Sequence, residues 1–259
     1  MTGVPDTAAA VRIRWVLLAA TLVSGLALLA AQATGYAGTV AVTLALALVV
    51  AWGWPRITGS ATPSATSGVL AVAAVAIVLS ARDAGLRWLP AAVAFGLVLA
   101  FFGQLVRRSG REGLVLTLLS SFGGLAVTAS GATAVVAAQS DRGRAVAVVA
   151  LAAVVAAVLG DLLAAAPALR ARPGAVGAVG LVGTAVVASV VAAVVSTRFD
   201  EVGPGTALAI GAAVGVVSWA LRRVLALEPE LPTLRGQLAA GAASVLAVGA
   251  VINLATALT

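Results

Sequence analysis

Long apolar segments alternate with short polar connections along the whole chain. The segments have roughly the 17–25 residues that an α-helix needs to cross about 30 Å of hydrocarbon. This pattern predicts an all-α fold, a polytopic transmembrane helical bundle of about nine spans. The predicted spans are Trp15–Ala33, Tyr36–Gly53, Ala65–Ala81, Trp88–Val106, Leu114–Ala137, Ala145–Ala166, Ala175–Val195, Thr206–Leu221 and Leu238–Leu258.

The connections between these spans are short and contain glycine or proline, which interrupt helices. Even the longest cytoplasmic connection, residues 222–237, is too short for a soluble domain. We therefore expect a cytoplasmic N-terminal tail at residues 1–13 and a single integral-membrane helical domain at residues 14–259. The first span also has features of a cleavable signal peptide, ending in Ala31-Gln32-Ala33. We favour an uncleaved helix, because the stretch is long for a signal peptide and another span follows at once.

The composition agrees with this class and excludes several kinds of chemistry. Hydrophobic residues make up 62% of the chain and charged residues only 10%, against roughly a quarter charged in soluble domains. The chain has no cysteine, histidine or lysine, so disulfide bonds, histidine ligands and lysine nucleophiles are excluded. We expect no cofactor and no metal site. The net charge of +7 does not indicate nucleic-acid binding, because the arginines are scattered through short loops.

Arginines concentrate in every second connection, which predicts the orientation of the chain, since cytoplasmic loops carry an excess of basic residues. We expect a multi-pass protein of the cytoplasmic (inner) membrane, with a cytoplasmic N-terminus and an external C-terminus. The five tryptophans lie near predicted span ends, where indole rings favour the headgroup layer. The cytoplasmic set is Arg12, Arg14, Arg56, Arg107, Arg108, Arg111, Arg170, Arg172, Arg222, Arg223 and Arg235, and the external set is Arg82, Arg87, Arg142, Arg144 and Arg198.

An aspartate interrupts the sixth predicted span, in the stretch AAVVAAVLGDLLAAAPALRARPG. A carboxylate at the centre of a transmembrane helix costs about 2.5–3.5 kcal/mol on insertion scales, so it normally faces the bundle interior and marks a functional site. Asp161 is therefore the main candidate functional residue, together with Arg170 and Arg172 of the next basic loop. Both arginines lie roughly 14–17 Å further along a continued helix, too far for direct pairing. The alternative is a structural carboxyl group, protonated or hydrogen-bonded.

Small residues recur at helical spacing in the spans around Asp161. Such residues let helices approach closely in lipid, so we predict close packing at these positions. The sets are Ser120, Gly124 and Thr128 in the fifth span, Gly174, Gly177, Gly180 and Gly183 in the seventh, and Gly211 and Gly215 in the eighth. The expected polar neighbours of Asp161 are Thr117, Ser120, Ser121, Thr184 and Ser189.

Two segments, ALALVVAWGWP and VVAAVLGDLLAAAPALRARPGAVGAVGLVGTAVVAS, resemble the phosphatidate cytidylyltransferases (CDP-diacylglycerol synthases), membrane enzymes with nine spans. The resemblance places Asp161 at the family's intramembrane acidic position and Pro173-Gly174 at its glycine-rich helix entry. The catalytic motifs differ, because the family's lysine-rich loop reads ALRARPG here. The region of its terminal signature, ALRRVLALEPELPTLRGQLAAGAAS, contains no aspartate or histidine. Cytidylyl transfer needs divalent metal held by carboxylates, so the resemblance implies a relative without an intact catalytic site.

The sequence therefore predicts a non-catalytic membrane protein with a cytidylyltransferase-like scaffold. Its expected partners are membrane lipids and either another membrane protein or a second copy of the chain. One alternative is a small-molecule permease that uses Asp161 to couple transport to protons, although no internal repeat is evident. The other is a diverged lipid-modifying cytidylyltransferase.

The predicted orientation can be tested by cysteine accessibility, because the chain has no native cysteine. Single cysteines beside Arg108 and Arg222 should react with a membrane-impermeant reagent only from the cytoplasmic side. Cysteines beside Asp83 and Asp200 should react only from outside. Labelling of the 107–111 connection from outside would reverse the predicted orientation of every span.

Overall fold

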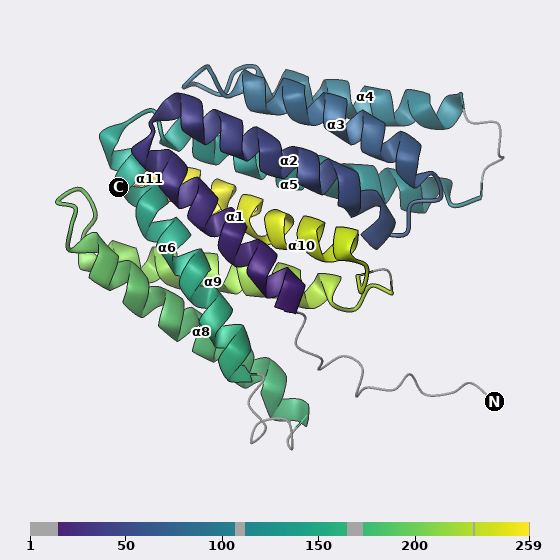
Figure 1. Cartoon of the computed structure of the whole chain (residues 1–259). Coiled ribbons are helices and arrows are strands. Elements are labelled where there is room, and N and C mark those ends of the chain that lie inside the picture. The colour runs from purple at the N-terminus through teal and green to yellow at the C-terminus, as the bar shows by residue number, and fades with distance from the viewer. Residues whose placement is uncertain (1–14, 107–111, 165–172, 230, 259) are drawn as a thin grey trace.

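The computed structural model describes residues 15–106, 112–164, 173–229 and 231–258, which form helices joined by turns and contain no strand. Figure 1 shows the long helices running alternately in opposite directions through a single bundle. The predicted all-α polytopic bundle is confirmed. The helices are α1 (Trp15–Ala33), α2 (Tyr36–Ile57), α3 (Pro63–Ser80), α4 (Leu89–Leu105), α5 (Leu114–Ala137), α6 (Asp141–Ala164), α8 (Pro173–Ser196), α9 (Pro204–Leu225), α10 (Leu234–Leu246) and α11 (Gly249–Leu258).

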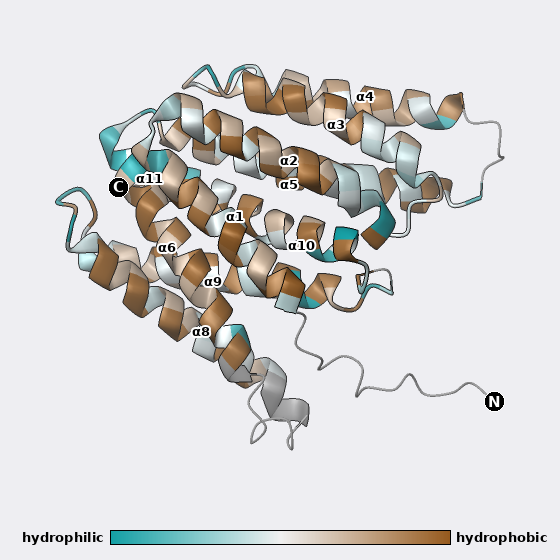
Figure 2. Ribbon diagram, in the orientation of Figure 1, coloured by the Kyte–Doolittle hydropathy of each residue, from teal (hydrophilic) through white to brown (hydrophobic). Residues whose placement is uncertain are grey.

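Among the described residues, eight helical stretches are long and apolar enough to cross a membrane. One of them, Leu234–Leu258, combines α10 and α11, and α4 adds a shorter apolar helix of 17 residues. Figure 2 shows hydrophobic residues along the helices and hydrophilic ones concentrated at helix ends and in connections. The chain is an integral-membrane protein, and a helix corresponds to each of the nine predicted spans.

Two helices extend four residues past the C-terminal ends of their predicted spans. Helix α2 continues through Pro55 to Ile57, and α9 continues to Leu225 instead of ending at Leu221. Arg222, predicted to lie in a loop, is therefore a helical residue that is 3% exposed. The exposed Leu227, in the connection after α9, is consequently a better position for an accessibility probe than the neighbours of Arg222.

The last span is interrupted where α10 ends at Leu246 and α11 begins at Gly249. Ser130 of α5 inserts its side chain at the break. Its Oγ donates to the carbonyl oxygen of Ala247 at 2.8 Å and accepts from the N–H of Ala250 at 2.9 Å. A polar side chain inserted into the backbone ladder is a recognised cause of helix kinks, and it accounts for this break.

Helix α10 lies at the centre of the bundle, where it packs against α1, α2, α5 and α9. Every residue from Ala239 to Leu246 is buried. Small side chains permit this enclosure, because a Cβ added at Gly241 would come within 2.6 Å of the Ala20 Cβ. The central helix is therefore fixed by close backbone contact more than by large side chains.

Helix α8 presents small residues at every fourth position to α6 and α9. The predicted close packing at the GxxxG motif of α9 is confirmed, because a Cβ at Gly211 would lie 2.6 Å from the carbonyl oxygen of Ala188. The prediction is wrong for Gly177 and Gly183, whose added Cβ would meet no atom within 4 Å. The buried positions of α8 are Gly180, Thr184, Ala188, Ala192 and Ser196.

The small-residue face of α5 is also confirmed. Ser120, Gly124 and Thr128 are all buried. A Cβ on Gly124 would lie 2.8 Å from Leu70 of α3 and 3.2 Å from Trp54 of α2, so this face is where α5 meets its two neighbours.

Alanine at Gly211 should lower the thermal stability of the purified protein in detergent. The added methyl group meets the backbone of α8, which cannot move aside like a flexible side chain, and overpacking of this kind costs about 1–3 kcal/mol. Gly183→Ala on α8 is the matched control, because it meets no atom and gains helix propensity. Equal melting temperatures for the two variants would contradict the α8–α9 contact.

Candidate functional site

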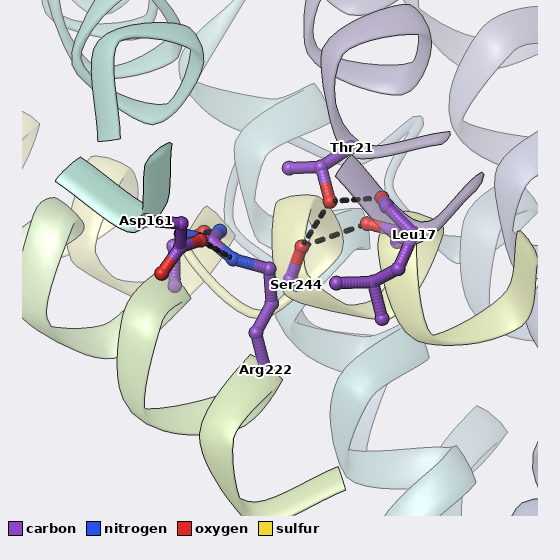
Figure 3. Close-up of polar contacts among 7 residues, drawn as sticks. Leu17, Thr21, Asp161, Arg222 and Ser244 are labelled. Carbon is purple, nitrogen blue, oxygen red and sulfur yellow. Dashed lines mark hydrogen bonds and ion pairs between the residues drawn. The ribbon is translucent and has the colours of Figure 1, made fainter. Parts of the chain in front are cut away.

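The carboxylate of Asp161 pairs with the guanidinium group of Arg222 inside the bundle (Figure 3). Arg222 Nε donates to Asp161 Oδ2 at 2.7 Å, which joins α6 to α9. The side chain of Arg222 is 2% exposed and that of Asp161 is 17% exposed. The intramembrane carboxylate thus has a cationic partner 61 residues away in the sequence.

Close helix packing brings these two side chains within reach of each other. Gly160, the residue before Asp161, lies against Thr184 of α8, and a Cβ at position 160 would collide with the Thr184 backbone. Gly215 of α9 also packs against Thr184, since a Cβ added at Gly215 would lie 3.2 Å from the Thr184 carbonyl oxygen. Helices α6, α8 and α9 therefore converge beside the ion pair.

A second contact fixes the orientation of the Arg222 side chain. Arg222 Nη1 donates to Ser218 Oγ, one helical turn earlier, at 2.6 Å. Arg222 Nη2 and Thr184 Oγ1 are buried without a hydrogen-bond partner among the described residues. A guanidinium group has five N–H donors and cannot be deprotonated in proteins, so this charge stays in place and depends on Asp161 for its neutralisation.

The Asp161–Arg222 pair contributes to the stability of the folded bundle, independently of any other role. A charged group in the membrane is costly and almost always pairs within the bundle. Removing one member of a buried pair leaves an uncompensated charge, which typically costs about 3–5 kcal/mol, whereas replacing both with apolar residues is often tolerated. Asp161 and Arg222 are therefore each necessary because the other is present.

Of the residues expected near Asp161, one lies beside it and the other four form hydrogen bonds elsewhere. Asp161 lies at a helix–helix contact, as expected, and Thr184 lies against the adjacent Gly160. Ser120 instead contacts Thr58 Oγ1 at 2.6 Å, and Ser189 donates to the carbonyl oxygen of Leu208. Thr117 and Ser121 also bond elsewhere, Thr117 Oγ1 with the N–H of Ala61 and Ser121 Oγ with the carbonyl oxygen of Thr117. Arg170 and Arg172 lie outside the described residues.

Arg222 is the site residue that the sequence reasoning missed. Its assignment to a loop followed from ending the span where the Arg222-Arg223 pair begins. A usable signal was present, because Ser218 and Arg222 stand at i and i+4 on one helical face. A lone buried acid in one span also requires a base or donor at the same depth in another span.

A second polar cluster joins α1 to α10 (Figure 3). Thr21 Oγ1 donates to the Leu17 carbonyl oxygen at 2.9 Å and lies 3.4 Å from Ser244 Oγ. Ser244 Oγ donates to the carbonyl oxygen of Gly241 at 2.8 Å. These hydroxyl groups satisfy each other and their own helices, so the cluster is a helix–helix contact that offers no reactive group.

Arg223, unlike Arg222, is exposed in the last turn of α9. Its guanidinium carbon lies 5.8 Å from the centre of the Trp219 ring. A surface hollow beside it is lined by Arg223, Val224, Ala226 and Leu227. Val224 and Leu227 are both exposed, so the hollow combines one cation with apolar side chains.

The tryptophans at the end of α2 contact protein groups. Arg235 of α10 lies over the Trp52 ring at 4.5 Å and donates from Nε to the Trp52 carbonyl oxygen at 2.5 Å. Trp54 is only 6% exposed and donates from Nε1 to the Ser120 carbonyl oxygen at 2.9 Å. The prediction that every tryptophan anchors in the headgroup layer is therefore wrong for Trp54, which is a core residue.

Among the described residues, no group of three or more histidine, cysteine, aspartate or glutamate residues lies together as a metal site would require. The ion pair supplies one carboxylate, already engaged with an arginine. Comparisons with protein-family models, with curated proteins and with solved structures find no match.

We expect Asp161→Leu to lower the thermal stability of the purified protein strongly, by about 3–5 kcal/mol, because Arg222 stays buried and charged. Asp161→Leu combined with Arg222→Leu should recover most of this loss. Asp141→Asn is the control, since its pair with Arg144 is solvent-exposed and such pairs contribute about 0–1 kcal/mol. Additive losses in the double variant would show that the two side chains do not act as a pair.

Proposed function

We propose that this protein is a non-catalytic membrane protein that binds anionic lipid headgroups at the end of α9. The observation that carries the proposal is the hollow beside Arg223, where a guanidinium group lies next to exposed apolar side chains. A phospholipid offers the complementary parts, a phosphate group and the start of an acyl chain. Arginine suits phosphate because its planar fork can donate two parallel hydrogen bonds.

In this proposal the two consecutive arginines have different roles: Arg222 stabilises the helix packing, and Arg223 binds the lipid. Arg222 is buried and neutralised by Asp161, so its charge is not available to attract a lipid. Arg223 lies beside the Trp219 ring with no acidic partner among the described ion pairs. Asp161 and Arg222 thus fix the rotation of α9, and that rotation directs Arg223 outward.

The surrounding charge supports the same location. Arg56 at the end of α2 and Arg235 at the start of α10 lie at the end of the bundle where α9 also ends, as the alternating helix directions in Figure 1 show. In the proposed orientation this end faces the cytoplasm, where anionic lipids attract basic segments. Tryptophan beside arginine also favours the headgroup layer.

The resemblance to the phosphatidate cytidylyltransferases supports a lipid as the ligand class, because those enzymes act on an anionic phospholipid. In this proposal the scaffold is similar and the catalysis is lost. The missing lysine and aspartate motifs support that loss, as does the engagement of Asp161 by Arg222.

A permease is the second candidate, and the interrupted last span favours it. Transporters commonly place their binding sites at helix breaks within the bundle. Asp161 is not among the residues that line the pocket beside the break between α10 and α11, so a proton-coupling role for Asp161 would need a site other than this break.

Lipid binding can be measured by native mass spectrometry of the purified protein with defined lipids. Phosphatidylglycerol and phosphatidic acid should be retained in preference to phosphatidylcholine, and the preference should weaken as salt screens the charges. Arg223→Gln should weaken retention roughly fivefold, since a basic residue near anionic lipid contributes about 1 kcal/mol.

Arg198→Gln provides the matched control, because it removes one arginine from the opposite end of the bundle and should leave anionic-lipid retention unchanged. Equal losses in both variants would contradict a site at Arg223 and indicate a diffuse charge effect. Formation of CDP-diacylglycerol from phosphatidic acid, CTP and Mg²⁺ by the same preparation would contradict the non-catalytic proposal and support the diverged enzyme.

A further inference from the structure

Two arginines from different helices meet at one end of the bundle. Arg56 lies in the last turn of α2, and Arg235 lies in the first turn of α10. The two helices touch through their backbones here, because a Cβ added at Gly53 would lie 2.6 Å from the Arg235 carbonyl oxygen. The charges of Arg56 and Arg235 lie close enough to repel each other. The fold therefore concentrates positive charge at this point.

The guanidinium group of Arg235 is held in a fixed position against α2. Its central carbon lies 4.5 Å from the centre of the Trp52 ring, and Nε and Nη2 both donate to the Trp52 carbonyl oxygen. Nη2 also donates to Ser67 Oγ of α3 at 3.5 Å. Nη1 makes no hydrogen bond within the described part of the chain, so its two N–H groups are available to a ligand.

No acidic side chain of the described residues neutralises these two arginines. The ion pairs found there involve Arg87, Arg144 and Arg222 instead. The dipole of α10 adds to the positive potential at Arg235, because the amino end of a helix carries about half a positive charge. Two like charges held together without a counter-charge destabilise the folded protein. An anion at this point removes that cost, whereas a water molecule does not.

We propose that Arg56 and Arg235 together bind the phosphate group of an anionic lipid. Guanidinium groups suit phosphate oxygens, to which they can donate parallel hydrogen bonds. Trp52 beside them is 48% exposed, and an indole ring at the end of a span favours the headgroup layer, where lipid phosphates lie. The site is separate from the hollow beside Arg223, whose lining includes neither of these arginines.

Arg56→Gln tests the site without loosening the fold, because the Arg56 side chain forms no hydrogen bond or ion pair with the described residues. In detergent alone this variant should melt at or above the temperature of the unmodified protein, since the repulsion from Arg235 is relieved. In native mass spectrometry its retention of phosphatidylglycerol should weaken roughly fivefold, the factor that corresponds to about 1 kcal/mol per basic residue. Undiminished retention would overturn the proposal.

Arg235→Gln separates lipid binding from helix packing. This variant loses the contacts with Trp52, so it should melt at a lower temperature in detergent alone and also retain less phosphatidylglycerol. Arg142→Gln is the matched control, because Arg142 is an exposed arginine outside the ion pairs and lies at the opposite end of the bundle. A loss of retention in Arg142→Gln equal to that in Arg56→Gln would indicate a diffuse charge effect and overturn the site.

Free phosphate is the other possible source of the ligand. The melting temperature is therefore compared in sodium phosphate and sodium chloride at equal ionic strength, and the two salts should give the same value. Because a ligand that binds only the folded state raises the melting temperature, a rise specific to phosphate that is absent from Arg56→Gln would overturn a lipid as the ligand.

The effect of Arg56→Gln is measured again in Arg223→Gln, which distinguishes this site from the proposed function. The loss of phosphatidylglycerol should be the same in both backgrounds, because the two sites use different residues. If Arg223→Gln alone retains lipid normally, the hollow beside Arg223 is wrong and the site at Arg56 stands. If Arg56→Gln has no effect once Arg223 is replaced, a separate site at Arg56 and Arg235 is overturned.

Discussion

Contact between helix backbones is the constraint on which the rest of this bundle depends. Lipid supplies no hydrophobic force that drives helices together, so helices must approach closely enough for dispersion and polar contacts to act. Gly160, Gly211 and Gly215 allow this approach between α6, α8 and α9. The Asp161–Arg222 pair follows from it, because a 2.7 Å contact between side chains on two helices requires their axes to be close.

Most of the architecture could be predicted because it follows from local sequence properties. Apolar length defines the spans, and small residues at i and i+4 mark the packing faces of α5 and α9. The prediction from the glycines spaced three apart on α8 failed for Gly177 and Gly183, since spacing identifies a face but not whether a neighbour lies against it. Which faces meet depends on all the helices at once, and that information is not contained in any one segment.

The candidate site shows the same division between local and long-range information. Asp161 was identifiable alone, because an acid within an apolar run is conspicuous at any position. Arg222 was not, since an arginine near a span end ordinarily belongs to the membrane surface. Only the folded bundle distinguishes Arg222, bonded to Ser218 and Asp161, from Arg223, which turns to the surface one residue later. Likewise, the small pocket lined by Gln32 combines residues of α1, α2, α5 and α6 with the break between α10 and α11.

The enclosure of α10 has a consequence for the order in which the protein is made. Its central residues touch protein on all sides, yet the chain reaches this helix only after the helices that surround it. Until α10 is inserted, the faces of α1 and α2 that contact it in the folded bundle lack this partner. Insertion of α10 fills this interior, so a helix that is synthesised after its neighbours becomes the centre of the bundle.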